Sequence, residues 1–208
     1  MEYFQDSMNK KFGDRGPDVI LEIGSRDLLD AIKMTTIWPN AKIFSFEPNP
    51  ETYPRCAEKA KDYPNITVLN MAISDVDGEV DFYIVGENDG GSSLLAPIDV
   101  PYSDGTSKCV KVQCRRLDTW LPQQGIYKVD AIWIDAQGVE YRALKSMNSF
   151  LRSVQVMKAE ATVTPYYEGQ DTKDDLEQFL IEEGFEIRNF LPGCQHPYGE
   201  GDFNLIRK

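Results

Sequence analysis

The chain has 208 residues, of which 41% are hydrophobic and 27% charged, and its formal net charge at pH 7 is −12. A single domain of this length buries about 70% of the surface of its unfolded chain, so it can form an ordinary globular core. The acidic balance argues against a nucleic-acid partner, because proteins that bind a phosphate backbone usually present a basic face.

The distribution of apolar residues, cysteines and histidine narrows the class of protein further. No apolar run approaches the roughly 18 residues of a membrane span, and the opening stretch MEYFQDSMNKKFGDRG lacks the apolar core of a signal peptide. The cysteines show no Cys-x-x-Cys spacing and are interpreted as free thiols; they are Cys56, Cys109, Cys114 and Cys194. We therefore expect a cytoplasmic protein that binds neither nucleic acid nor membrane.

The first half of the chain alternates between strand-like and helix-like segments. Strands are predicted over 18–23, 41–47 and 66–73, and helices over 28–38 and 49–63. Asn49 is expected to cap the second helix, and Pro50 or Pro54 would occupy its first turn. Strand and helix alternating at this pitch are typical of parallel βαβ units.

The second half continues this pattern and then changes it. Strands are predicted over 77–85, 108–117, 129–135 and 154–162, and helices over 140–151 and 171–184. The last helix has Asp171 or Thr172 as its cap and Gly184 as its terminator. The closing strands, 185–191 and 202–208, are joined by a link too short for a crossover helix, so they should pair antiparallel. The predicted fold class is α/β, with a mostly parallel, doubly wound seven-stranded sheet, helices on both faces and an antiparallel last strand.

Two segments stand outside this regular pattern. Residues 1–17 are interpreted as an N-terminal extension, and residues 18–208 as the functional domain. The polar loop 86–107, rich in Gly, Ser and Asp, is longer than compact domains usually need. It is predicted to be a lid or an acceptor contact, with mobile surface as the alternative.

Polar residues gather where the predicted parallel strands end. In an open α/β sheet, ligands bind beyond the carboxyl ends of the strands. Gly24 follows the first strand and would let a ligand approach the backbone, while Glu47 ends the second strand and can accept hydrogen bonds from both ribose hydroxyls. These two positions predict an adenosine-containing ligand but do not by themselves choose between NAD and S-adenosylmethionine.

The loop after the first strand favours S-adenosylmethionine. A dinucleotide site uses the pattern G-x-G-x-x-G, whereas this chain has Gly24 followed by Ser25, Arg26 and Asp27. Asp27 would repel a pyrophosphate, and the nearby Glu22 suits the positive charges of S-adenosylmethionine. A nucleotide-dependent oxidoreductase is therefore the rival hypothesis, disfavoured by the missing glycines.

Six stretches follow one another as in a known family of methyltransferases. They are VILEIGSRD, FSFEPNP, NMAISDVDGEVDFYI, VQCRRLDTW, DAIWIDAQGVEYRAL, and EGFEI followed by GDFNLIR. Over residues 18–207 the chain resembles the FkbM family of S-adenosylmethionine-dependent methyltransferases, and IDAQGVE (134–140) is similar to the family's K-I-D-V-E-G-x-E. The resemblance implies a Rossmann-like class I methyltransferase fold. It also implies methyl transfer to a hydroxyl oxygen of a sugar, glycan or small metabolite.

The resemblance also implies roles for individual residues in binding S-adenosylmethionine. Glu22, Gly24 and Ser25 would form the cofactor loop, and Glu47 with Pro48 would hold the ribose. The adenine would be bordered by Asn70, Met71 and Ala72, and the transferable methyl by Asp135 and Gln137.

The chain departs from the family pattern at several of these positions. In the first loop Glu22 replaces Asp, Arg26 replaces Asn and Leu28 replaces the second Gly; in the later motif Trp133 replaces Lys and Gln137 replaces Glu. These replacements keep a third hypothesis open, a catalytically silent module that binds S-adenosylmethionine and methylates nothing.

Three residues are candidates for the group that takes the acceptor's proton. Asp135 is the first, with a helix N-cap as its alternative role, and Glu160 is the second, with a polar strand end as its alternative. The single histidine, His196, is the third, although a surface-loop position is the simpler reading. Glu140 is expected in the first helical turn, where it favours the helix dipole. A magnesium ion held by Asp135 with Glu160 or Glu140 is an alternative for which the sequence shows no complete ligand set, so no metal is assigned.

Overall fold

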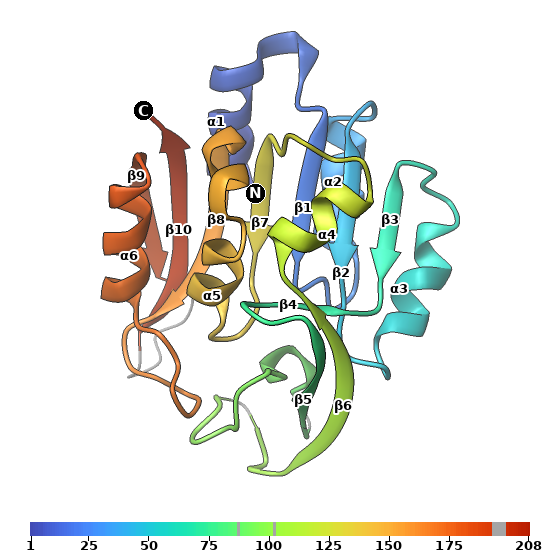
Figure 1. Cartoon of the computed structure of the whole chain (residues 1–208), viewed down its shortest axis with the longest axis vertical. Coiled ribbons are helices and arrows are strands. Elements are labelled where there is room, and N and C mark those ends of the chain that lie inside the picture. Colours follow the sequence, from blue (N-terminus) through green and yellow to red (C-terminus); the bar gives the residue numbers. More distant parts are fainter. Residues whose placement is uncertain (87, 102, 193–198) are drawn as a thin grey trace.

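The computed structural model describes residues 1–86, 88–101, 103–192 and 199–208, and its centre is a seven-stranded sheet (Figure 1). The strand order is β3-β2-β1-β7-β8-β10-β9. The strands are β1 (Val19–Ile23), β2 (Lys42–Phe46), β3 (Ile66–Leu69), β7 (Ala131–Ile134), β8 (Val156–Thr162), β9 (Phe185–Pro192) and β10 (Glu200–Arg207). β10 runs antiparallel to both neighbours, and the other pairs are parallel. The mostly parallel sheet with an antiparallel last strand is thereby confirmed.

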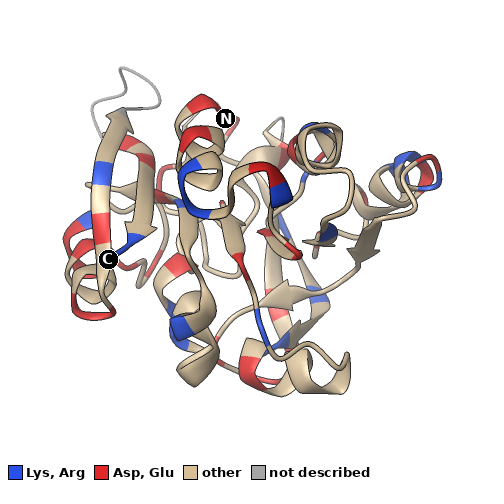
Figure 2. Cartoon of the chain, turned by 90° about the horizontal axis from the view of Figure 1, so that it is seen from above, with Lys and Arg blue, Asp and Glu red and all other residues tan. Residues whose placement is uncertain are grey.

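Helices cover both faces of this sheet, as Figure 2 shows in the view from above. One face carries α1 (Glu2–Phe12), α2 (Leu29–Ile37) and α3 (Tyr53–Ala60), and the other carries α4 (Leu117–Gln123), α5 (Glu140–Lys145) and α6 (Lys173–Glu182). Short 3₁₀ helices are η1 (Gly13–Arg15), η2 (Asp89–Gly91) and η3 (Asn148–Ser153). Each face buries its own hydrophobic cluster, so the sheet is the middle layer of three. Within the described ranges, no helix has the length and apolar character to cross a membrane.

A second, three-stranded sheet lies beyond the carboxyl ends of the parallel strands (Figure 1). It consists of β4 (Ala72–Ile73), β6 (Ser107–Arg115) and β5 (Gly78–Val85), in that order. The single strand predicted over 66–73 is therefore wrong, because the chain turns at Asn70 and passes from one sheet to the other. The Asn70 side-chain amide donates to the carbonyl oxygens of Glu47 and Pro48 at 2.8 and 3.2 Å, which holds this turn against the end of β2.

Two predicted helix boundaries need correction. The cap of α3 is Thr52 rather than Asn49, whose side-chain oxygen instead accepts the Glu51 amide at 2.9 Å in a turn before the helix. The helix predicted over 140–151 ends at Lys145 and resumes as a 3₁₀ helix, because Asn148 takes a left-handed conformation with φ of 49°.

The start and end of α6 are as predicted. Thr172 caps the helix by accepting the Asp175 amide, and the Asp175 carboxylate accepts the Thr172 amide at 2.9 Å in return. Gly184, just past the end, has φ of +87°, which favours glycine and ends the helix.

Helix α1 was not expected from the sequence, and it packs onto the sheet as part of its core. Phe4 is 1% exposed and meets the ring of Trp133 edge-on at 5.3 Å between centroids and that of Trp38 at 6.1 Å. Met8 is fully buried in the same cluster. Residues 1–17 therefore contribute to the core of the layer that also carries α2, while the boundary at residue 18 stays a prediction.

Replacing Phe4 by Ala should lower the free energy of unfolding by about 3–5 kcal/mol, because it removes a buried ring and leaves a cavity between two tryptophans. Urea unfolding followed by tryptophan fluorescence measures this change. The matched control is Tyr3→Ala, since Tyr3 is 49% exposed and its loss should cost no more than about 0.5 kcal/mol. Equal effects of the two substitutions would show that α1 does not stabilise the core.

Candidate active site

A cavity of about 260 Å³ opens at the carboxyl ends of β1, β2, β7 and β8. One end is formed by the loop after β1 and the end of β2, and the other by the turn after β7, the carboxyl end of β8 and the first residue of β10. Residues of the loop 86–107 line it from the side of the small sheet. This is the edge of the sheet at which a parallel α/β fold binds its ligands.

Gly24 sets the distance between the two ends of the cavity. Its φ is +86°, and a Cβ atom at this position would lie 1.8 Å from the carbonyl oxygen of Asp135. The amide of Asp135 donates to the carbonyl of Ile23 at 2.9 Å, so the two strand ends are held against each other. A side chain at position 24 would push the turn after β7 away from the loop after β1.

The rest of the first loop keeps a left-handed backbone without further glycines. Arg26 and Leu28 have φ of 53° and 66°, although Leu28 stands where the family pattern has glycine. Such conformations cost about 1–3 kcal/mol for a residue with a side chain. Two contacts hold the loop in place: the Arg26 amide donates to Glu47 at 2.6 Å, and the Leu28 side chain is fully buried.

Glu47 lies at the end of β2, with its carboxylate at the cavity wall. Its two oxygens accept the amides of Arg26 and Asn49 at 2.6 and 2.8 Å. Burial raises the pKa of Glu47, and these amide hydrogen bonds oppose the rise. Each carboxylate oxygen keeps a second lone pair, so the group can still accept hydrogen bonds from a ligand's hydroxyls.

Pro48, Met71 and Ala72 line the cavity beside Glu47 and form an apolar wall where a flat ring would fit. Asn70 stands outside this lining, because its side chain is used to brace the backbone of Glu47 and Pro48. Of the stretch expected around the adenine, two residues therefore face the cavity and one supports it.

Glu22 and Ser25 also support the cavity from outside its lining. Glu22 is 1% exposed, and its carboxyl accepts the Ala31 amide at 2.8 Å in the first turn of α2. Burial raises the pKa of Glu22 to about 7, while the hydroxyls of Ser45 and Ser25 oppose the rise. The buried side chain of Glu22 therefore packs beneath the loop that follows β1, and the hydroxyl of Ser25 reaches it from that loop.

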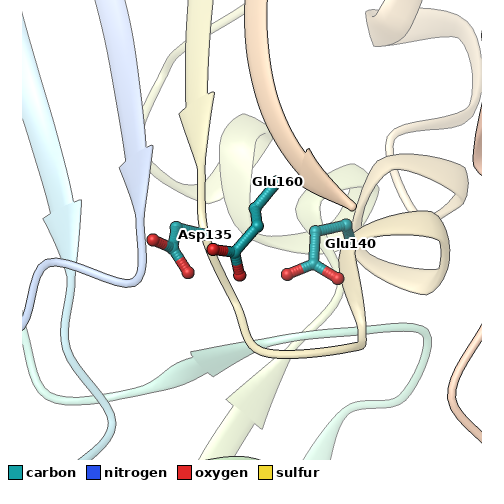
Figure 3. A group of neighbouring side chains, drawn as sticks. All are labelled: Asp135, Glu140 and Glu160. Atoms are coloured by element: carbon teal, nitrogen blue, oxygen red, sulfur yellow. The ribbon is translucent and has the colours of Figure 1, made fainter. Parts of the chain in front are cut away.

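Three carboxyl groups stand in a row at the opposite end, with Glu160 between Asp135 and Glu140 (Figure 3). One oxygen from each lies within 4.8 Å of the others. Glu140 is 6% exposed and accepts the amides of Ala136 at 2.7 Å and Gly138 at 3.0 Å. Glu140 thus fixes the turn after β7, and burial raises its pKa to about 7.

Asp135 and Glu160 face the cavity as a hydrogen-bonded pair. The side-chain amide of Gln137 donates to Asp135 at 2.6 Å and to Glu160 at 2.7 Å. The pKa of Glu160 is raised well above its usual value by burial first, and then by the charges of Asp135 and Glu140. When two carboxyl groups lie this close in a buried place, one of them holds a proton.

The three carboxyl groups offer the hard oxygen atoms that a divalent cation prefers. However, the NH₂ group of Gln137 points at two of them, and backbone N–H groups occupy the third. This arrangement suits a shared proton better than a cation.

Residues 86, 88–101 and 103–107 are the described part of the loop 86–107, and their partners lie in four other segments, which are the loop after β1, α3, β5 and the stretch after β8. Asp89 forms ion pairs with Arg26 and Arg55, both at 2.9 Å. Ser93 exchanges backbone hydrogen bonds with Tyr83 at 2.7 and 3.0 Å, and Ile98 donates to Tyr166 at 2.8 Å. The loop thereby joins the Glu47 end of the cavity to the carboxylate end, and its role as a lid stays a prediction.

The structure brings most of the predicted site residues together in one cavity. The predicted residues that line it are Gly24, Glu47, Pro48, Met71, Ala72, Asp135, Gln137 and Glu160.

His196 and Cys194 lie outside the described residues. Sequence reasoning gave no site role to Arg26 and Glu200, because only the folded chain places them at the cavity. Tyr166 and Tyr167 are buried, at 2% and 1% exposure. Tyr166 lines the cavity, and the Tyr167 hydroxyl contacts Gln137.

The strand order, the single glycine under the first loop and the acidic end of β2 define a Rossmann-like methyltransferase. The family model of the methyltransferase FkbM domain matches residues 18–187, and the chain belongs to this family. The expected class, a methyltransferase that uses S-adenosylmethionine, is confirmed.

Two curated proteins and a solved structure illustrate the similarity. The chain is 32% identical to the 2-O-methyltransferase NoeI of Sinorhizobium fredii over 168 residues, covering 74% of this chain and 68% of NoeI. It is 25% identical to the hexuronic acid methyltransferase AglP of Haloferax volcanii, covering 76% of this chain and 59% of AglP. Fibrillarin of Aeropyrum pernix, solved with bound S-adenosyl-L-methionine, shares the fold with a TM-score of 0.55 at 15% identity, over 91% of this chain and 66% of fibrillarin.

The raised pKa of Glu22 predicts a pH dependence of stability. The pKa is about 7 in the folded chain against a usual value of 4.5, so the folded state binds this proton more tightly. The stabilisation is complete below the unfolded pKa and is lost as the pH rises through the folded pKa. Between pH 5 and pH 7.5 the free energy of unfolding should fall in the wild type by roughly 2 kcal/mol more than in Glu22→Gln, which lacks this titration.

Urea unfolding of both proteins at the two pH values measures this difference. Glutamine keeps an oxygen for the Ala31 amide, so the substitution should not disrupt the turn into α2. Parallel pH profiles of the wild type and the variant would show that Glu22 is already ionised in the folded protein.

Proposed function

We propose that the protein transfers the methyl group of S-adenosylmethionine to a hydroxyl oxygen of a sugar. The observation that carries this proposal is the pair Asp135 and Glu160, placed at one end of a cavity whose other end is the Gly24 loop and Glu47. A cofactor held at that loop by its ribose would direct its sulfonium toward the pair.

The residues of the cavity divide between binding and chemistry. Glu47 would accept hydrogen bonds from the ribose hydroxyls, and Pro48, Met71 and Ala72 would pack against the adenine. The open backbone at Gly24 would let the amino-acid part of the cofactor approach β1. S-adenosylmethionine supplies an electrophilic methyl group on a sulfonium when bound.

The transfer is an in-line displacement at the methyl carbon. The acceptor oxygen would form a bond to the methyl carbon while the carbon–sulfur bond breaks, and the electron pair of that bond would stay on the sulfur of S-adenosylhomocysteine. The hydroxyl proton must leave, and a carboxylate within hydrogen-bond reach takes it as charge develops in the transition state. Burial, followed by the charges of Asp135 and Glu140, raises the pKa of Glu160. We therefore assign the shared proton to Glu160 and the role of general base to Asp135.

The charge of the cavity favours a neutral acceptor. Asp135, Glu160 and Glu200 line the end where the acceptor must lie. Among the described residues of the lining, Arg26 is the only basic one, and it lies at the cofactor end in an ion pair with Asp89. A carboxylate on the sugar would face these acidic groups without a partner. A neutral sugar hydroxyl, as the name of the relative NoeI implies, fits better than the hexuronic acid in the name of AglP.

S-adenosylhomocysteine should bind with a Kd in the micromolar range, while NAD should not bind at comparable concentrations. Glu47→Gln should weaken S-adenosylhomocysteine by about tenfold or more, because hydrogen bonds to a charged group contribute about 1.5–3 kcal/mol. Isothermal titration calorimetry measures all three. Thermal unfolding of Glu47→Gln must be recorded beside it, since a fully folded variant with unchanged affinity would remove Glu47 from the ribose site.

Asp135→Asn should lower kcat by about 10²–10⁴-fold and leave the affinity for S-adenosylhomocysteine within about twofold, because only the proton acceptor is lost. The assay follows transfer of a labelled methyl group to a pool of neutral methyl glycosides, beside the matching methyl glycosiduronic acids. The label should enter the neutral sugars.

The matched control is Asp14→Asn, an exposed carboxylate on η1 outside the cavity lining. Label that entered the uronic acids alone would overturn the assignment of a neutral acceptor. Full activity of Asp135→Asn would overturn the role of Asp135 and leave the cofactor site untouched.

A further inference from the structure

Gln137 lies where the loop 86–107 meets the carboxylate pair. It sits in the turn between β7 and α5, with a left-handed φ of 52° that an ordinary residue avoids. From this position its side-chain amide reaches Asp135 at 2.6 Å and Glu160 at 2.7 Å. One NH₂ group has two protons, so it can donate to both carboxyl groups at once.

The two carbonyl oxygens of Gln137 face Tyr167 and the loop 86–107. Its side-chain oxygen lies 3.0 Å from the hydroxyl of Tyr167, which in turn lies 2.8 Å from the carbonyl oxygen of Gly91. Its backbone carbonyl accepts the hydroxyl of Ser93 at 2.6 Å. Both Gly91 and Ser93 belong to the loop 86–107. Gln137 is thus bonded to the loop on one side and to the carboxylate pair on the other.

An amide, which stands here in place of the glutamate of the family pattern, suits this position for a physical reason. Asp135, Glu140 and Glu160 lie around it, and Glu200 lines the same end of the cavity. A fifth carboxylate at position 137 would accept hydrogen bonds but donate none once ionised, and it would repel its neighbours. The amide instead offers two protons to the pair and an oxygen to Tyr167.

We propose that Gln137 is a positioning residue that couples the seating of the loop 86–107 to the alignment of Asp135 and Glu160. When the loop is seated, Tyr167 and Ser93 hold Gln137 in its left-handed turn, and the amide holds the two carboxyl groups in place. When the loop leaves, Gln137 loses the Ser93 hydroxyl, and Tyr167 loses the Gly91 carbonyl oxygen that helps to position its own hydroxyl. The shared donor of the carboxylate pair is then no longer held in place. The proton acceptor is therefore aligned only in the closed cavity. This inference rests on the proposed function for the roles of Asp135 and Glu160.

The test uses Gln137→Glu, which keeps the shape of the side chain and makes its charge depend on pH. The titratable groups that face the new carboxyl are Asp135, Glu140, Glu160, Glu200 and Tyr167. At pH 8 the ionised side chain should be expelled and the loop released. At pH 5.5 the protonated side chain should again serve as a donor and the loop should return.

Amide hydrogen exchange reports the loop directly, because the amides of Tyr83 and Ser93 are bonded to each other's carbonyls across its base. At pH 8 these amides should exchange about tenfold faster in Gln137→Glu than in the wild type, once intrinsic rates are corrected, and within about twofold of it at pH 5.5. The matched control is Gln113→Glu, which adds the same charge to an exposed position on β6 and should leave exchange unchanged at both pH values.

Two outcomes would overturn the coupling. Wild-type protection of the loop in Gln137→Glu at pH 8 would show that Gln137 does not hold it, and equally fast exchange at both pH values would show a structural defect without the proposed electrostatics. A second variant, Tyr167→Phe, removes the link without adding charge, and it should speed exchange at Ser93 equally at both pH values. Unchanged exchange in Tyr167→Phe would exclude this link. None of these measurements needs cofactor or acceptor, whereas S-adenosylhomocysteine titration of the wild type tests the proposed function separately.

Discussion

The site depends on the close approach between the loop after β1 and the carbonyl oxygen of Asp135. Only glycine fits at position 24, because a Cβ atom would lie 1.8 Å from that oxygen. This contact brings the proposed cofactor loop and the proposed catalytic turn to one fixed separation. A displacement reaction along a single line requires such a fixed separation, since donor and acceptor atoms must meet at the distance of a near-attack geometry. The remaining features of the cavity, including the left-handed loop and the buried acids, hold these two pieces of backbone in place.

Buried carboxyl groups do much of this holding. Glu22, Glu47 and Glu140 each accept backbone amides, at the start of α2, at the loop after β1 and at the turn after β7. An acid is well suited to a turn in which several N–H groups lack partners, because one carboxyl group can accept more than one of them. Burial disfavours the charged form of these groups, and it raises the pKa of all three. In this acidic chain, some of the carboxyl groups at the site therefore support the backbone and others face the ligand.

Most of the fold and part of the site could be predicted from the sequence. Features that depend on neighbouring residues were predicted, and features that depend on contacts between residues far apart in the sequence were not. The order of strands and helices follows from local patterns. Gly24, Glu47 and Asp135 stand out because Gly24 directly follows a predicted strand and the other two are the last residues of theirs. The turn at Asn70 was missed because its cause is a hydrogen bond to Glu47, 23 positions earlier. The link from Gln137 to Tyr167 and Gly91 spans 30 and 46 positions and has no local signal. Helix α1 was missed for a similar reason, since its buried face is completed by Trp38 and Trp133.

The ion pairs of Asp89 have a consequence for the exchange of cofactor and product. Asp89 bridges Arg26 and Arg55 at the cofactor end of the cavity, yet the side chains of the two arginines are 59% and 48% exposed. Exposed ion pairs contribute about 0–1 kcal/mol each and are screened by salt. The loop is thus fastened weakly at the proposed cofactor end and by hydrogen bonds that are at least partly buried at the proposed acceptor end. Ionic strength should therefore act on the release of S-adenosylhomocysteine, with little influence on the arrangement of the reacting groups.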